Sequence, residues 1–384
     1  MTNFAYFDNA ATTFPKLPSV LKATTDFVTQ FGVNAGRGQY DVAAIAAKMV
    51  KETRGKLLEL LHARPEHTVV FTPSATIALN MVLQGQRWKG GETVYISHFE
   101  HNAVTRVLHV LKERHNLQIK YLAMAGDSTE YDLDAIKKQF SEAQPNYLIC
   151  SHASNVCGTI APIMDICSAA KEYGATTILD MAQSAGLLEI SLTRLKVDFC
   201  VFAGHKTLLG LVGVGGFICR TGAPLDCILY GGTGLMSKEP TMPKDWPDRY
   251  EPGSSNTTAI ASLNAAIDYI KGIGRERIEA AEQENKMRLL SLLREYNNIR
   301  IVGENKNSVG IVSCIFDGYS PDNIGNVLND KGVAVRTGLH CAPDAHKFLG
   351  TFGAGTVRLS VNSFTTLDDF HKLKAALDII HQSS

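Results

Sequence analysis

The amino-acid sequence predicts an α/β protein, with a large domain built on a mostly parallel sheet and a smaller α+β domain at the C-terminal end. Three observations predict this class. The chain has 384 residues, which exceeds the size at which one hydrophobic core usually keeps growing. From residue 69 onwards, short β-branched runs alternate with stretches of helical period. This alternation stops at a Pro- and Gly-rich stretch, residues 231–258. We expect residues 17–258 to form the large domain, and residues 1–16 with 259–384 the small one.

The strands of the large domain are predicted from short runs of apolar and β-branched residues. Continuous runs such as YLIC (147–150) and TTIL (176–179) are typical of strands that are buried on both faces of a parallel sheet. Helical stretches join the strands, and parallel neighbours need such crossover connections. In chain order, the expected elements are strand 68–73, helix 74–84, strand 92–98, helix 102–115 and strands 147–154, 176–183, 198–206 and 213–220.

The second domain mixes helices and strands without the regular alternation. Two helical stretches open it, and residues 274–296 form the more clearly amphipathic of the two. The elements that follow are a strand at 308–316, a helix at 320–332, a short strand at 333–336, a strand at 356–362 and a final helix from about Leu367. This order predicts an α+β arrangement.

The composition argues against several classes of function. Lys plus Arg and Asp plus Glu each number 38, so we expect neither nucleic acid nor a charged membrane surface as a partner. The N-terminal residues 1–16 are too polar for a secretory signal, and no apolar run reaches the roughly 20 residues of a membrane span. The eight cysteines include no CxxC pair, which argues against a disulfide framework or a zinc ribbon. A reducing cytoplasmic location fits best.

Polar residues gather where the predicted strands end. Ligands of open α/β sheets bind at the carboxyl ends of the strands, so this gathering favours a site there. Polar caps of strand-to-helix turns alone account for about half of these residues. The residues are Ser74, Thr76, His98, His101, His152, Asn155, Asp180, Gln183, His205 and Lys206.

One lysine among them, Lys206, favours a specific cofactor. It ends a strand and precedes the glycine-rich TLLGLVGVGG, while Asp180 ends the preceding predicted strand and Gln183 follows it. Pyridoxal phosphate chemistry needs a lysine amine for a Schiff base and an acidic residue on the pyridine nitrogen. Thr76, near a helix N-terminus, offers a hydroxyl and backbone N–H groups to a phosphate. The GVGG run lacks the spacing of a dinucleotide-binding fingerprint.

Motifs along nearly the whole chain carry a resemblance to a known family. They are FDNAATTFPK (7–16), FTPSATIALN (71–80), HFEHNAV (98–104), SHASNVCGTI (151–160), LDMAQSAG (179–186), AGHKTLLG (203–210), YEPGSSNT (250–257), VRTGLHCAP (335–343) and VRLSVNSFTT (357–366). The chain resembles the class V, fold-type I pyridoxal-phosphate enzymes, and among them the cysteine desulfurases and selenocysteine lyases. The resemblance implies a pyridoxal-phosphate-binding large domain and pyridoxal 5'-phosphate as the cofactor. It also implies L-cysteine or selenocysteine as the substrate, a homodimer, and a sulfur-acceptor protein as a partner.

The resemblance also implies a role for each matching residue. Lys206 would carry the cofactor and later move the proton at Cα, Asp180 would pair with the pyridine nitrogen, and Gln183 would bind the ring oxygen. His101 would stack on the ring. The phosphate would be held by Thr76, His205 and Ser254 of the partner subunit, and Ala75 would be a further cofactor-binding residue. The substrate carboxylate would be held by Arg358 and by Asn155, which also borders the cofactor. Arg336 would be a further substrate-binding residue.

Cys341 is the predicted nucleophile, taking sulfur from the substrate as a persulfide. It lies in a loop-like segment beside Arg336 and His340, a setting that favours the thiolate. The other cysteines have apolar surroundings typical of core residues: Cys150, Cys157, Cys167, Cys200, Cys219, Cys227 and Cys314. A metal site of His340, Cys341 and His346 does not fit a standard zinc spacing, so we expect no metal.

Two positions depart from the family pattern. Ala203 stands where members of the family commonly carry a hydroxyl residue before GHK, so Thr233 or Ser254 would have to supply that phosphate contact. Leu339 stands in place of a histidine beside the nucleophile. Two alternatives therefore stay open. The chain could be a class V enzyme of other chemistry, such as a selenocysteine lyase, amino-acid lyase or aminotransferase. It could also act mainly as a sulfur-delivery partner of an acceptor or scaffold protein.

Overall fold

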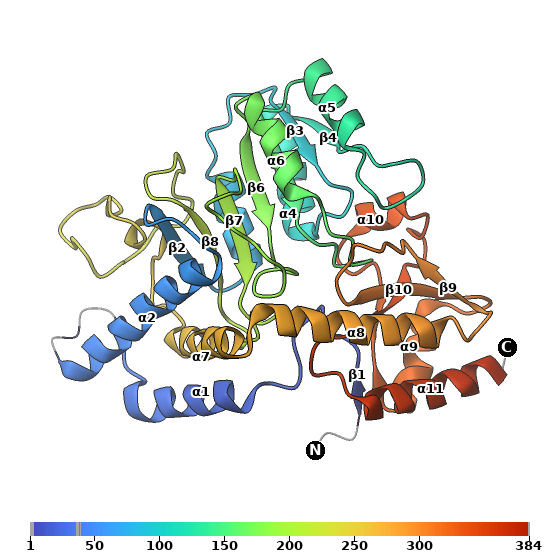
Figure 1. Cartoon of the computed structure of the whole chain (residues 1–384). Helices are drawn as coiled ribbons and strands as arrows, with labels where there is room; N and C mark the ends of the chain where they lie inside the picture. The colour runs from blue at the N-terminus through green and yellow to red at the C-terminus, as the bar shows by residue number, and fades with distance from the viewer. Residues whose placement is uncertain (1–3, 36–37, 39, 383–384) are drawn as a thin grey trace.

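The structure is a computed structural model that describes residues 4–35, 38 and 40–382. The predicted domains also include residues 1–3, 36, 37, 39, 383 and 384, which lie outside the described residues. A seven-stranded and a four-stranded sheet stand beside each other, and the long helix α8 (Arg275–Leu293) runs beneath both (Figure 1). The predicted α/β class is confirmed.

The large sheet is parallel except at one strand. Its order is β2 (His67–Thr72), β8 (Gly215–Arg220), β7 (Phe199–Ala203), β6 (Thr176–Asp180), β5 (Tyr147–Ser151), β3 (Thr93–Ile96) and β4 (Gln118–Tyr121). The pairs from β7 to β4 are parallel, whereas β8 is antiparallel to both β2 and β7. The prediction of a mostly parallel sheet is therefore confirmed. The expected helices between successive strands are absent in two places: residues 181–198 connect β6 to β7 through turns, and residues 204–214 return the chain from β7 to the antiparallel β8.

Helices cover both faces of this sheet because its strands are apolar on both sides (Figure 1). Along β7, Phe199 and Val201 pack with α3 (Ala75–Gln84) and α4 (Asn102–His115). Cys200 and Phe202 face the other side, where the covering helices are α1 (Pro18–Phe31), α2 (Asp41–Leu60), α5 (Leu133–Glu142), α6 (Ile163–Glu172) and α7 (Thr257–Ile273). The alternation of side chains along each strand thus separates two hydrophobic layers.

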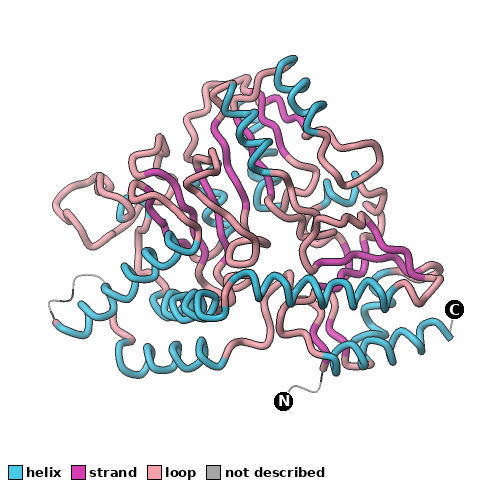
Figure 2. The backbone as a smooth tube through the Cα atoms, viewed as in Figure 1, coloured by secondary structure: helices cyan, strands magenta, loops and turns pink. Residues whose placement is uncertain are grey.

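The second sheet is antiparallel and consists of strands from the C-terminal part of the chain. Figure 2 draws the strands of both sheets in magenta. Its order is β12 (Arg336–Gly338), β13 (Thr356–Ser360), β10 (Ile311–Phe316) and β9 (Ile299–Val302). Beside it, β1 (Ala5–Tyr6) pairs in parallel with β11 (Val333–Ala334). The single strand expected at 333–336 is therefore wrong, because Val335 separates β11 from β12. The accompanying helices are α9 (Pro321–Asp330), α10 (Pro343–Phe348) and α11 (Leu367–Gln382).

Helix α8 connects the two hydrophobic cores. Ile278 near its start packs into the core of the large sheet, whereas Leu289 and Leu293 near its end pack into the core of the small sheet. The division at residues 16/17 and 258/259 stays a prediction. In residues 231–256 the only helical element that the described residues form is the short η1 (Asp248–Tyr250), and α7 begins at Thr257. Among the described residues, no helix is both long and apolar enough to cross a membrane.

Candidate active site

A cavity of about 240 Å³ lies where the carboxyl ends of the large-sheet strands meet the small sheet. Eleven of the twelve predicted site residues line it: Ala75, Thr76, His101, Asn155, Asp180, Gln183, His205, Lys206, Arg336, Cys341 and Arg358. The twelfth, Ser254, lies elsewhere in the chain's own fold, in a neighbouring pocket with Glu251 and Pro252. His98 and His152, which also follow strands, do not line the cavity. The fold thus brings together residues from distant parts of the sequence, while their roles remain predictions.

A larger cavity, of about 560 Å³, opens at the opposite edge of the sheet beside Lys196 and Arg220. Buried polar atoms without a partner distinguish the two cavities, because such atoms are costly unless they serve a ligand or water. Among the described residues, the buried unpartnered side-chain atoms are His205 Nδ1, His340 Nδ1, His346 Nε2 and Arg358 Nε. Three of these four residues line the smaller cavity and none lines the larger. The smaller cavity is therefore the candidate active site.

Local structure explains how α3 and β8 border this cavity. Ser74 caps α3 by accepting a hydrogen bond from the backbone N–H of Ile77, which places Ala75 and Thr76 in the first turn. The β8 backbone approaches this turn closely at Gly215, where a Cβ atom would lie 2.6 Å from the Ala75 nitrogen. Only glycine allows this approach, so the helix N-terminus reaches the cavity wall.

Lys206 and Asp180 are two of the charged residues that line the cavity. Burial lowers the pKa of Lys206 to about 8, with Arg358 and Arg336 adding to the effect and Asp180 opposing it. Burial also raises the pKa of Asp180, although a hydrogen bond from the Ala182 backbone N–H (2.8 Å) and the charge of Lys206 act in the other direction. The lysine is therefore a readily neutralised amine beside a carboxylate.

Two histidines in the cavity are held in the neutral form. Burial, followed by the charge of Lys206, lowers the pKa of both His101 and His205 to about 4. His101 Nδ1 accepts a hydrogen bond from the Ala103 backbone N–H at 3.0 Å, so its ring orientation is set by the start of α4. His205 Nδ1 has no partner. A neutral imidazole with a free ring nitrogen can donate a hydrogen bond to an anion such as a phosphate.

These residues fit pyridoxal phosphate. The fit rests on the unpartnered Nδ1 of His205, the amine of Lys206 and the carboxylate of Asp180, which all line one cavity. Gln183 also lines it, and its Nε2 donates one hydrogen bond to the Ala10 carbonyl (2.9 Å), which leaves a second hydrogen for a ligand.

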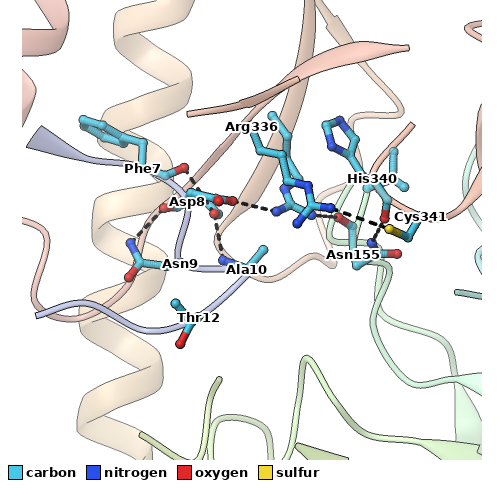
Figure 3. A network of polar contacts seen from close by, with 12 residues as sticks. Phe7, Asp8, Asn9, Ala10, Thr12, Asn155, Arg336, His340 and Cys341 are labelled. Carbon is cyan, nitrogen blue, oxygen red and sulfur yellow. Dashed lines mark hydrogen bonds and ion pairs between the residues drawn. The ribbon is translucent and has the colours of Figure 1, made fainter. Parts of the chain in front are cut away.

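The loop that carries Cys341 is held in an unusual conformation (Figure 3). His340 and Cys341 both have positive φ angles, 49° and 58°, which non-glycine residues rarely adopt. The Asn155 side-chain amide donates to the His340 carbonyl, and the Asn102 backbone N–H donates to the Cys341 carbonyl, both at 2.7 Å. Arg336 Nη2 lies 3.6 Å from the Cys341 sulfur. The surroundings therefore impose the position of this thiol.

Cys341 also differs from the other seven cysteines in exposure. All eight are free thiols, and Cys341 alone is half-buried while the others are buried. Burial raises the pKa of Cys167 and Cys314 to about 12, and it also raises the pKa of Cys150 and Cys200 well above the usual value for a thiol. Such thiols stay protonated and weakly nucleophilic. Of the eight, Cys341 is the thiol that a substrate in the cavity can reach.

Arg358 has an acidic partner that the sequence did not reveal. Its guanidinium is 2% exposed and donates to Asp8 Oδ1 (2.7 Å) and to the Asn155 carbonyl (2.9 Å), while its Nε has no partner. Asp8 and Asn155 are both labelled in Figure 3. Asp8 belongs to the FDNAATTFPK motif, but its distance of 350 residues from Arg358 left no local signal for the pairing. The guanidinium keeps donors free for a carboxylate.

The histidines near Cys341 are engaged in hydrogen bonds with hydroxyl groups. His340 Nε2 lies 2.9 Å from Thr356 Oγ1, and His346 Nδ1 lies 2.7 Å from Thr351 Oγ1. Within the described part of the chain, no group of three or more His, Cys, Asp or Glu side chains is arranged to hold a metal ion.

Glu100 is a second residue that the sequence did not single out. It is fully buried (0% exposed), and its carboxylate accepts hydrogen bonds from the Ser97 hydroxyl, the Ser151 backbone N–H (2.7 Å) and the Ser151 hydroxyl (2.9 Å). Ser151 is the strand neighbour of Asp180, and His101 follows Glu100 directly. Glu100 therefore connects the segment that carries His101 to the end of β5, which lies beside Asp180. Burial raises its pKa to about 7, with Asp180 adding to the rise.

Replacing Glu100 with glutamine is expected to change how stability depends on pH. A raised carboxyl pKa means that the folded parent holds a proton that the unfolded chain releases. The parent therefore loses stability as the pH rises from 4.5, the ordinary pKa, to about 7. Glu100→Gln lacks this loss, because its amide can donate to the Ser151 hydroxyl without a charge. Relative to the parent, its free energy of unfolding should rise by about 2.5 kcal/mol between pH 5 and pH 8.

Chemical denaturation at several pH values measures this difference. Glu282 is also buried with a pKa raised to about 7, but it is present in both proteins and cancels in the comparison. The exposed Glu172→Gln serves as the control and should give a flat difference. A flat difference for Glu100→Gln as well would contradict the assignment.

Known proteins resemble this chain along almost its full length. The model of the aminotransferase class-V family matches residues 5–373. A probable cysteine desulfurase of Methanothermobacter thermautotrophicus is 30% identical, over 99% of this chain and 95% of its own. Another probable cysteine desulfurase, of Xylella fastidiosa, is 32% identical, over 97% of this chain and 89% of its own.

Solved structures of cysteine desulfurases are also similar to this chain. An apo cysteine desulfurase of Thermococcus onnurineus has a TM-score of 0.90 and 27% identity, over 99% of this chain and 95% of that chain. For a cysteine desulfurase of Escherichia coli the TM-score is 0.84 at 22% identity, over 98% of this chain and 94% of that chain, a likeness of fold alone.

Proposed function

The chain belongs to the aminotransferase class-V family, and from this premise we propose that it is a pyridoxal-phosphate-dependent cysteine desulfurase. In this proposal it converts L-cysteine to L-alanine and holds the released sulfur as a persulfide on Cys341. One observation carries the proposal: an amine beside a carboxylate (Lys206, Asp180), a half-buried thiol (Cys341) and a guanidinium with an unpartnered Nε (Arg358) line the same cavity.

The cofactor would be held by the residues that fit it. Lys206 would bind it covalently, Asp180 would keep the ring nitrogen protonated, and Gln183 and His101 would contact the ring. Ala75, Thr76 and His205 would bind its phosphate. When bound, pyridoxal phosphate acts as an electron sink that makes the Cα–H bond of an amino acid acidic.

In this proposal, different side chains bind the substrate and remove its Cα proton. Arg358, held by Asp8, and Asn155 would bind the α-carboxylate of cysteine and orient its Cα–H bond towards Lys206. Arg336 lines the same wall. Lys206 would take the Cα proton, a task suited to an amine whose pKa is lowered to about 8, because a large neutral fraction exists near physiological pH.

The thiolate of Cys341 would then attack the sulfur atom of the substrate. A sulfur–sulfur bond forms as the Cβ–S bond of cysteine breaks, and the electron pair of that bond goes to Cβ, which is protonated to give alanine. The sulfur atoms are oxidised to the persulfide level while the carbon is reduced, so no external oxidant is needed. The attack is of the same kind as thiol–disulfide exchange.

The oligomeric state, the location and the sulfur acceptor are part of the same proposal. Ser254 is exposed and does not line the cavity of its own chain, which supports a homodimer in which Ser254 of the partner subunit reaches the phosphate. The eight free cysteines support a reducing, cytoplasmic location. The persulfide on a half-buried Cys341 would pass its sulfur to an acceptor protein.

A substrate panel with persulfide detection tests the function. The protein with its cofactor is incubated with L-cysteine, selenocysteine or amino acids with 2-oxo acids. Alanine, sulfide, selenide and new amino acids are assayed. Mass spectrometry follows the sulfur on the peptide that contains Cys341. The expected result is equal alanine and sulfide from cysteine, with a Cys341 persulfide trapped before an acceptor thiol is added.

Other outcomes would identify the alternatives. Alanine from selenocysteine alone would indicate a selenocysteine lyase, and new amino acids formed from 2-oxo acids would indicate an aminotransferase. Turnover that needs an added acceptor thiol protein would favour a sulfur-delivery partner. Alanine formed from cysteine without any persulfide at Cys341 would contradict the proposed mechanism.

A further inference from the structure

The backbone conformation of His340 and Cys341 depends on contacts with the surrounding structure. Both residues lie in the left-handed backbone region, with φ angles of 49° and 58°, and neither is a glycine. Residues held there persist only where the surrounding structure imposes the conformation. The hydrogen bonds from Asn155 and Asn102 hold the two carbonyl groups. Helix α10 (Pro343–Phe348) follows immediately, so its position also determines where the thiol lies.

Helix α10 is attached to the large sheet through a stack of three aromatic rings. The imidazole of His98, in the turn after β3, lies between Tyr121 at the end of β4 and Phe348 at the end of α10. The His98 and Phe348 ring centroids are 4.3 Å apart at an interplanar angle of 25°. The His98 and Tyr121 centroids are 4.7 Å apart at 10°. Both faces of the imidazole are thus covered, at distances typical of stacked aromatic pairs.

Two further contacts hold the stacked rings and α10 in place. The Tyr121 hydroxyl donates to Asp344 Oδ2 at 2.9 Å, so the first turn of α10 is attached to the ring that also stacks on His98. Phe99 packs edge-on against Phe348, with centroids 5.9 Å apart at 89°. Helix α10 is therefore attached to the sheet edge at both of its ends.

His98 does not line the active-site cavity, and the sequence offered it only as one polar residue among several at the strand ends. We propose that His98 is a positioning residue: its ring, held between Tyr121 and Phe348, fixes α10 and thereby keeps Cys341 in the cavity. This inference rests on the proposed function for its catalytic consequence. The stack itself needs only a flat ring, because no hydrogen bond of the His98 side chain occurs among the described residues.

Two substitutions distinguish the role of the flat His98 ring from the role of its nitrogen atoms. His98→Ala removes the stack, whereas His98→Phe keeps a flat ring without nitrogen atoms. The matched control is His381→Ala, which removes another histidine ring from an aromatic contact (5.7 Å from Tyr296), far from Cys341 in α11.

Hydrogen exchange of the holoenzyme reports on the loop without any assay of activity. The Asn102 amide donates to the Cys341 carbonyl, and the Ala342, His346 and Leu349 amides are bonded within the loop and α10. In His98→Ala these amides should exchange about tenfold faster or more, while amides of the large-sheet strands keep the parental rate. His98→Phe and His381→Ala should match the parent within about twofold.

Steady-state kinetics with L-cysteine give the second measurement. A thiol displaced from the cavity should lower kcat by about tenfold or more, because reacting atoms must be held in place. KM should change by less than about threefold, because the Arg358 and Asn155 contacts to the carboxylate are not touched. His98→Phe should restore kcat.

Three results would overturn the inference. In the first, exchange around Cys341 is unchanged in His98→Ala. In the second, exchange is faster but kcat is unchanged. In the third, His98→Phe is as impaired as His98→Ala, which would show that a ring nitrogen matters rather than the stack. If the parent itself releases no sulfide, the proposed function fails, and the exchange data alone decide whether His98 fixes the loop.

Discussion

Replacing Lys206 with alanine is expected to abolish covalent retention of pyridoxal phosphate and to lower sulfide release from cysteine by about 10²–10⁴-fold. Among the described residues, Lys206 is the only lysine that lines the active-site cavity, so no other amine there can replace it. Its pKa, lowered to about 8, makes it both a good partner for an aldehyde and a usable base. Reduction with borohydride followed by peptide mass spectrometry measures the attachment: the cofactor mass should be found on the Lys206 peptide of the parent and be absent from the variant.

Lys16 supplies a matched control for this experiment. Burial lowers its pKa to about 8 as well, and its Nζ donates to Thr12 Oγ1 and to the Gly210 carbonyl (both 3.1 Å) just outside the cavity. Lys16→Ala should keep the cofactor mass on Lys206. An unchanged cofactor mass in Lys206→Ala, carried by any other lysine, would overturn the assignment of this residue.

Replacing Cys341 with alanine is expected to lower sulfide release by about 10³-fold or more, because the substitution removes the nucleophile outright. The cofactor should stay attached to Lys206, since the side-chain hydrogen bond of Cys341 is with Arg336 and not with that lysine. The persulfide on the Cys341 peptide should disappear. Sulfide assays, borohydride trapping and peptide mass spectrometry on one preparation measure all three quantities.

Cys227 provides the control thiol. It is buried at 9% exposure, its sulfur donates to the Arg249 carbonyl at 3.4 Å, and it lies outside the cavity. Cys227→Ala should keep both sulfide release and the persulfide on Cys341. Full desulfurase activity in Cys341→Ala would show that sulfur leaves by a route that does not use this thiol.

Much of the fold was predictable from local sequence patterns. The continuous apolar run at 147–150 predicts a strand buried on both faces, and β5 is buried along its whole length. Ser74 predicts the start of α3, because a serine before a helical stretch satisfies a free backbone N–H group. Two exceptions are the connection from β6 to β7, which has no helix, and the antiparallel strand β8. A strand's direction depends on which edge of the sheet its connection reaches, and residues 204–214 carry no pattern that distinguishes a tight return from a crossover.

The candidate site was predictable where a motif carries its own chemistry. Lys206 and Asp180 follow strands of one sheet, so parallel order alone places them at the same edge. Asp8 and His98 lacked such a signal. Asp8 acts through an ion pair with Arg358, which lies 350 residues away, and His98 acts through rings of β4 and α10. Contacts between distant segments depend on how whole elements pack, which no local pattern records.

The sequence by itself determined the α/β class, the mostly parallel sheet, and eleven residues that line one cavity. The fold class and the sheet follow from periodicity and strand composition, which act over a few neighbouring residues. The site residues follow from local motif chemistry together with the resemblance to the family. Only the tertiary structure decided that Cys341 is held in a left-handed backbone conformation, that Asp8 holds Arg358, and that Ser254 lies outside the cavity of its own chain. The physical reason is that such arrangements are maintained by contacts between segments far apart in the chain, and these segments meet only once the two cores have packed along α8.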